Sequence, residues 1–143
     1  MMVLARLPGW HARLDALIDS YRRAELSYGH FDCAIFAALN VEALTGERIG
    51  KKAWWRYRSA EAGLRTMARA GFANLADMVA SLLPELEHPS RAYVGDIAAI
   101  PAENAFGFAL GIVGGERIFV LGEGYDGLGT VDLLTATRAF KVG

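Results

Sequence analysis

Hydrophobic positions in the first 83 residues recur at helical spacing and predict four helices. A helix over residues 8–23 is expected because apolar side chains share one face there: Trp10, Leu14, Leu17, Ile18 and Tyr21. A second helix, over residues 33–44, is apolar on almost every face, as buried helices are. Two further helices, over residues 60–70 and 75–83, each follow a residue type that favours a helix N-cap, Ser59 and Asn74.

From residue 93 the pattern changes to short apolar runs separated by glycines. It predicts a curved antiparallel sheet of roughly four to six strands. The candidate strands cover residues 93–100, 106–113, 117–121, 130–133 and 138–142, with a glycine-rich turn over 122–129. Gly114-Gly115 is a strong signal for a two-residue hairpin turn. Helices first and antiparallel strands second indicate one α+β domain over residues 1–143. Its helical half, about 8–83, is expected to pack on a β-meander, about 93–142.

Composition narrows the class of protein. Hydrophobic residues make up 53% of the chain and charged residues 22%, which favours a globular domain. The net charge of -1 gives no global attraction to nucleic acid or anionic membrane, although the net charge is +3 over residues 1–83 and -4 over residues 84–143. A single cysteine excludes an internal disulfide. We expect no membrane span, signal peptide, metal or cofactor, because no segment has the required length or ligand spacing.

The only cysteine, Cys33, lies where a tight loop runs into the buried helix. Asp32 is a good N-cap, which places Cys33 at the first helical position. Free N–H groups and the helix dipole favour a thiolate there, so Cys33 is either a nucleophile or a small hydrophobe retained from one. His30 could act as a substitute base, but a hydrogen bond within the loop is the favoured role. His11 and His88 are expected at the surface.

The order of these features resembles the NlpC-type cell-wall cysteine peptidases, a branch of the papain-like fold. The residues that carry the resemblance are Tyr28, Asp32 and Cys33 at the buried helix and Gly95-Asp96-Ile97 at the first strand. The chain is most similar to a compact branch found in the tail gene clusters of phages and gene transfer agents. Its typical features here are Gly29-His30-Phe31-Asp32-Cys33, Thr45-Gly46, Tyr57-Arg58-Ser59 and Leu110-Gly111-Ile112.

The resemblance implies a catalytic histidine at the start of the second strand and a polar residue on the next strand that orients it. In this sequence the histidine position falls at Ala109 and the orienting position near Val120-Leu121. The resemblance therefore implies a structural or assembly protein of a phage-like tail tip or hub. Such a protein is made in the bacterial cytoplasm, joins the virion tail and contacts other tail proteins. The alternative is an active peptidase or amidase that cleaves cell-wall peptides during DNA entry, with Cys33 as nucleophile and Tyr28 in the substrate groove. Whether the protein is an enzyme stays open, with the missing histidine weighing against it.

A basic and aromatic stretch covers residues 51–58. It could contact nucleic acid through charge and stacking, which the mild overall charge disfavours. We expect its aromatic residues to pack on the helical core with the cations in solvent. A protein contact through Trp54, Trp55 and Arg56 is also expected, because Trp and Arg are enriched at interaction hot spots.

Overall fold

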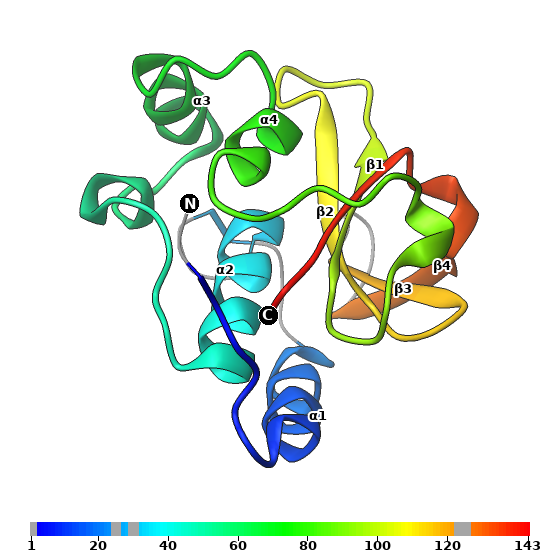
Figure 1. Ribbon diagram of the computed structural model, residues 1–143. Coiled ribbons are helices and arrows are strands. Elements are labelled where there is room, and N and C mark those ends of the chain that lie inside the picture. Colours follow the sequence, from blue (N-terminus) through cyan, green and yellow to red (C-terminus); the bar gives the residue numbers. More distant parts are fainter. Residues whose placement is uncertain (1–2, 24–26, 29–31, 122–126) are drawn as a thin grey trace.

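The computed structural model describes residues 3–23, 27–28, 32–121 and 127–143. Within these ranges the fold is α+β, and its elements follow the predicted order (Figure 1). The α-helices are α1 (Trp10–Tyr21), α2 (Cys33–Thr45), α3 (Ala60–Arg69) and α4 (Leu75–Ala80). Short 3-10 helices are η1 (Lys52–Trp55), η2 (Pro89–Arg91) and η3 (Leu133–Thr135). The strands are β1 (Ile97–Pro101), β2 (Phe108–Val113), β3 (Arg117–Leu121), β4 (Leu128–Asp132) and β5 (Arg138–Phe140).

The helix boundaries follow the capping residues of the sequence. Asp32, Ser59 and Asn74 each accept a hydrogen bond from the backbone N–H three residues later, as N-caps do. Gly46 ends α2 in the left-handed conformation, with φ at 79°. The prediction for α4 was too long, because regular helix stops at Ala80 and the chain reaches the buried Leu83 through a turn.

The five strands form one antiparallel sheet in the order β4-β3-β2-β1-β5. The predicted meander is therefore correct for β1 to β4 and wrong for β5, which returns to pair with β1 at the far side. Ala98, for example, lies opposite Gly111 on β2 and Ala139 on β5. Thus β1 lies inside the sheet with a neighbour on each side, and its residues Ile97, Ala98 and Ala99 are all buried.

Several predicted strand boundaries were wrong for local reasons. The first strand begins at Ile97, because the preceding residues form a turn in which the Tyr93 N–H reaches the Asp96 side chain. The β2–β3 turn is centred one residue later than predicted, since the Gly114 N–H donates to the Arg117 carbonyl and leaves Gly115 at φ 98°. The fourth strand starts at Leu128, inside the predicted glycine-rich turn, of which residues 122–126 lie outside the described ranges.

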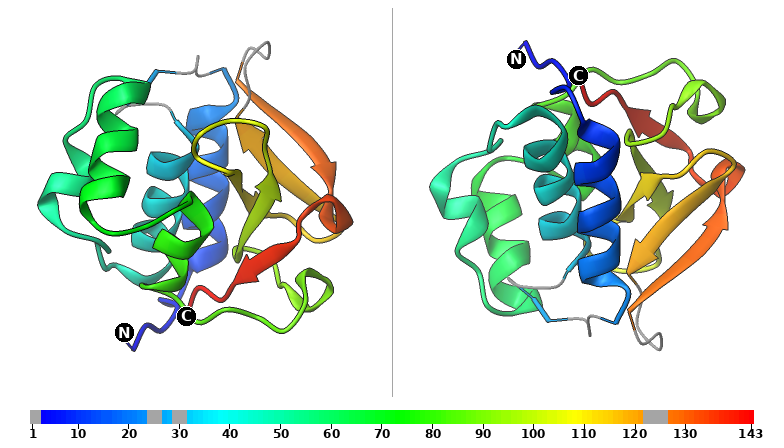
Figure 2. Two further views of the ribbon diagram at one scale, coloured as in Figure 1. Left: turned by 90° about the horizontal axis from the view of Figure 1, so that it is seen from above. Right: turned by 90° about the horizontal axis from the view of Figure 1, so that it is seen from below.

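The helices cover one face of the sheet, as both views in Figure 2 show. Helix α2 packs against both α1 and β2, and α4 packs against β2 and β5. The main core lies between these layers and includes Phe36, Leu44, Leu110, Ile112 and Phe140. A smaller apolar cluster on the other face of the sheet comprises Ala98, Val113, Ile118, Val120 and Ala136. No helix in the described residues is long and apolar enough to span a membrane.

A buried ion pair joins the two ends of the chain to the sheet. The Arg6 guanidinium lies 3.1 Å from Asp96 Oδ1, and their side chains are 13% and 4% exposed. Arg6 also donates to the carbonyls of Val94 and Val142, while Asp96 accepts from the N–H groups of Tyr93 and Val142. Asp96 therefore has a structural role, because its carboxylate satisfies backbone N–H groups at the turn before β1 and near the end of the chain.

Replacing Arg6 with methionine should destabilise the protein strongly. The change keeps much of the side-chain length but leaves the Asp96 carboxylate buried without its cation, which costs about 3–5 kcal/mol in comparable cases. The free energy of unfolding, measured in urea, should fall by that amount. Arg22→Met is the matched control, because the Arg22–Asp19 pair is more than 60% exposed at both side chains and should contribute about 1 kcal/mol or less. Equal small losses in the two variants would contradict the structural role assigned to Asp96.

Candidate functional site

The start of α2 is fixed by the buried carboxylate of Asp32. Its Oδ1 accepts the Ile35 N–H at 2.8 Å, and its Oδ2 accepts the Tyr57 hydroxyl at 2.6 Å. Burial, together with the charge and the hydrogen bond of Asp32, raises the pKa of Tyr57 well above its usual value. Tyr57 therefore stays protonated, and its bond to Asp32 ties the segment before α3 to the helix that carries Cys33.

Cys33 occupies the first position of α2, as the sequence predicts, and its surroundings raise the pKa of its thiol. Burial is the largest influence and raises the pKa of Cys33 to about 11, with the Asp32 charge acting in the same direction. Hydrogen bonds with the backbone of Leu110, Cys33 and Ala34 lower the pKa by less than burial raises it. The predicted thiolate-stabilising effect of the helix N-terminus is thus outweighed by desolvation, since burial penalises the charged form.

Cys33 lies in a groove of about 480 Å³. The groove is bounded by the start of α2, the segment that leads into α3, the loop before β2 and the ends of strands β2 and β3. Tyr28 contributes to its wall, as expected, and its ring stacks with Phe106 at a centroid distance of 6.3 Å. The lining residues are Tyr28, Asp32, Cys33, Ala34, Tyr57, Ala60, Leu64, Leu75, Glu103, Asn104, Ala105, Phe106, Phe108, Ala109 and Leu121.

The groove brings Cys33 together with two positions to which the resemblance assigns the catalytic histidine and the residue that orients it. Ala109, near the start of β2, and Leu121, at the end of β3, both line it. Neither side chain can accept a proton or orient an imidazole. The geometry therefore places a cysteine, an alanine and a leucine around one groove.

The described histidines lie elsewhere. The ring of His11 stacks on Trp10 at 3.5 Å, and His88 caps η2 with its Nδ1 near Ser90. Both are exposed and neither lines the groove, in agreement with the expected surface positions. His30 lies outside the described residues. Among the described lining residues, the titratable groups besides Cys33 are the carboxylates of Asp32 and Glu103 and the phenols of Tyr28 and Tyr57.

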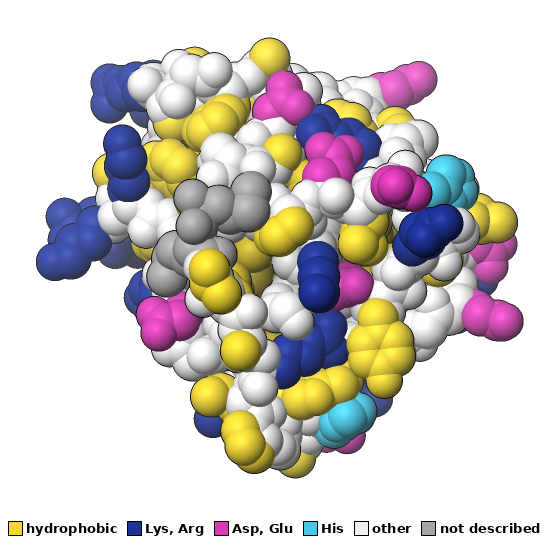
Figure 3. All heavy atoms as spheres, in the orientation of Figure 1, with side chains coloured by type: hydrophobic (Ala, Val, Ile, Leu, Met, Phe, Trp, Pro, Cys, Tyr) yellow, Lys and Arg dark blue, Asp and Glu magenta, His cyan; other side chains and the backbone are white. Residues whose placement is uncertain are grey.

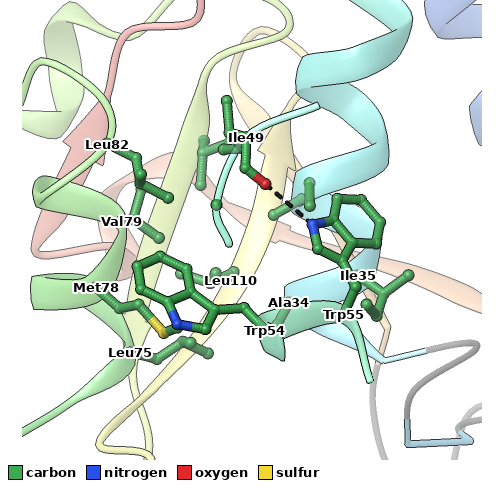
Figure 4. Close-up of a pocket in the computed structure, with 14 residues that line it drawn as sticks. Ala34, Ile35, Ile49, Trp54, Trp55, Leu75, Met78, Val79, Leu82 and Leu110 are labelled. Atoms are coloured by element: carbon green, nitrogen blue, oxygen red, sulfur yellow. Dashed lines mark hydrogen bonds between the residues drawn. The ribbon is translucent and has the colours of Figure 1, made fainter. Parts of the chain in front are cut away.

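A second hollow, of about 80 Å³, lies between α2, η1 and α4 and is drawn in Figure 4. The half-buried rings of Trp54 and Trp55 form part of its wall, while Lys51, Lys52 and Arg56 are exposed. The two indole rings therefore face α2 and α4 across the hollow, and the three cations are exposed as predicted. Of the three residues predicted for a protein contact, Trp54 and Trp55 line this hollow and Arg56 does not. Ala34 and Leu75 line both hollows.

Sequence reasoning missed two contacts that shape the groove. The Tyr57–Asp32 hydrogen bond joins residues 25 positions apart, and no local pattern indicates it. Phe106 was assigned to a strand, yet it precedes β2 and faces Tyr28 in the groove. No group of three or more His, Cys, Asp or Glu side chains that could hold a metal ion occurs in the described part of the chain.

These features define an α+β domain in which a cysteine-headed helix faces a sheet across a groove. The chain belongs to the family described as Domain of unknown function (DUF6950), whose match covers residues 5–142. No curated protein matches the sequence.

The thiol of Cys33 should react slowly with iodoacetamide in the folded protein. With a pKa of about 11 instead of 9, the thiolate fraction at pH 8 is about 100-fold smaller than that of an ordinary thiol. The alkylation rate should therefore be at least about 100-fold below that of the same chain unfolded in urea, and it should rise with pH up to about 11. A folded thiol that titrates below pH 8 would contradict this assignment.

Proposed function

We propose that this protein is an assembly component of a phage-like tail, near the tip or hub, built on a catalytically inactive form of the NlpC-type papain-like fold. The observation that carries the proposal is the groove in which Cys33 lies with Ala109 and Leu121. The resemblance assigns a catalytic base and its orienting group to the last two positions, and both side chains are apolar. The class of partner, other tail proteins, comes from the resemblance alone.

The chemistry of cysteine hydrolases supports this choice. Attack on a peptide carbonyl requires a thiolate, or a thiol that passes its proton to a base within hydrogen-bond reach. Here burial raises the pKa of the nucleophile candidate, and the alanine at the base position supplies no acceptor. The hydroxyl of Tyr57 lies in the same groove but donates a hydrogen bond to Asp32. The raised pKa of Tyr57 keeps it protonated, so it offers no phenolate to act as a base.

The same structure is suited to binding. The groove walls combine aromatic rings from Tyr28, Tyr57 and Phe106 with aliphatic side chains from β2 and β3. Clefts of this size and composition are typical of sites that hold a ligand or a protein segment. A chain that has lost the catalytic base keeps such a surface, and a tail subunit can use it to hold a neighbouring protein.

An active peptidase or amidase acting on cell-wall peptides is the second candidate. The observation that favours it is the position of Cys33 at the N-terminus of α2, where it lines the groove. Backbone N–H groups at a helix N-terminus can stabilise the oxyanion formed by thiol attack. This reaction would need a base from His30 or from a neighbouring chain.

Genetic complementation with Cys33→Ala separates the two candidates. In a bacterium whose phage-like particles depend on this gene, deletion should abolish tail assembly or particle infectivity. The Cys33→Ala protein should restore both to the wild-type level, because the proposed role does not use the thiol. Asp32→Ala is the contrasting variant, since it removes the carboxylate that fixes α2 and Tyr57 and should restore less. A stable Cys33→Ala protein that assembles particles unable to deliver DNA would contradict the proposal and favour the hydrolase.

A further inference from the structure

The hollow beside Trp54 and Trp55, called the tryptophan pocket below, is a second concave surface, separate from the Cys33 groove. Every side chain on its wall is apolar apart from the indole N–H groups, and Figure 4 shows the walls converging from α2, η1 and α4. Its volume of about 80 Å³ is roughly half that of an engineered apolar cavity that binds benzene. It therefore suits one aliphatic side chain.

The rings that form this pocket are held in place. The Trp55 Nε1–H donates to the Ile49 carbonyl at 3.0 Å, and the Arg48 guanidinium lies 4.2 Å from the Trp55 ring centroid. Trp54 packs edge-on against Phe72, and Gly50 lies so close that an added Cβ would be 2.9 Å from its ring. Fixed walls favour binding, because little conformational entropy is lost when a ligand enters.

The surface next to the pocket is positively charged. Residues 49–58 include four lysines and arginines and no acidic residue. Lys51 and Lys52 follow pocket residue Gly50 directly, Arg56 follows Trp55, and all three side chains are exposed. In Figure 3 the dark blue side chains project at the left edge, over the region of η1 and α3. An apolar hollow with a basic rim is complementary to an apolar side chain with acidic neighbours.

We infer that the tryptophan pocket binds an acidic segment of a partner protein, which inserts one aliphatic side chain between Trp54, Trp55 and α4. Nucleic acid fits this site less well. Base stacking needs an open aromatic face, whereas Arg48 covers Trp55 and Phe72 packs against Trp54. The inference goes beyond the proposed function, because it concerns a different hollow from the Cys33 groove and does not require the thiol to be inactive.

A selection from a randomised peptide display library on the folded protein tests the inference. The enriched peptides should carry a leucine, isoleucine, valine or methionine flanked by aspartates and glutamates. Ala38→Leu adds bulk to the pocket wall and should weaken binding of a synthetic enriched peptide at least tenfold. Ala43→Leu, on the same helix but outside the pocket, should leave the dissociation constant within twofold.

Charge reversal at the rim of the pocket tests the same inference independently of the pocket wall. Lys51→Glu combined with Lys52→Glu should weaken the peptide at least tenfold, while Arg65→Glu combined with Arg69→Glu on α3 should have a much smaller effect. This pair of variants carries the test even where Ala38→Leu does not fold. Cys33→Ala should bind the peptide as the wild type does, so this result is separable from the complementation result.

Three outcomes would overturn the inference. The first is a selection that enriches no peptide, or enriches peptides without acidic residues. The second is an enriched peptide whose binding is unaffected by both Ala38→Leu and the Lys51/Lys52 reversal. The third is a different occupant of the pocket. A single-stranded oligonucleotide that displaces the peptide and binds with steep salt dependence would indicate nucleic acid. Self-association that rises with protein concentration and is abolished by Ala38→Leu would indicate a second copy of the chain.

Discussion

The arrangement of the helical half and the sheet depends on the hydrogen bonds and the ion pair of the buried Asp96 carboxylate. It accepts hydrogen bonds from Arg6 near the start of the chain and from the Val142 N–H near its end. One residue earlier, the Gly95 carbonyl accepts the side-chain amide of Asn40 on α2. The entry to β1 is therefore tied at once to both ends of the chain and to the central helix. Because β2 pairs along the whole of β1, this attachment also sets where β2 faces α2, and so where Ala109 lies relative to Cys33.

Much of the helical half could be predicted because its signals are local. Asp32, Ser59 and Asn74 each satisfy an N–H group three residues away, so sequence alone indicates where α2, α3 and α4 begin. The position of β5 could not be predicted in the same way. Its pairing with β1 joins residues about 40 positions apart. The sequence of a strand as short as the three residues of β5 does not indicate which strand it pairs with.

The candidate site was predictable only in part. The sequence places Cys33 at the head of a helix, and the resemblance selects the positions of Ala109 and Leu121, which do line the same groove. The state of the thiol was not predictable, because the helix terminus and burial act in opposite directions and only the packing decides between them. Nor could the tryptophan pocket be foreseen. The sequence gives the aromatic and basic residues of η1, but the opposite wall comes from Met78 and Leu82, more than 20 residues later.

The central claim is that the Cys33 groove binds without performing hydrolysis. The most direct test is to incubate the purified protein with bacterial cell-wall peptides and follow both the peptides and the intact protein by mass spectrometry. We expect no cleaved peptide in the wild type or in Cys33→Ala, and no acyl adduct on Cys33 of the wild type. Cleavage that Cys33→Ala abolishes, or an adduct on that sulfur, would contradict the proposed function and show that the groove is an active site.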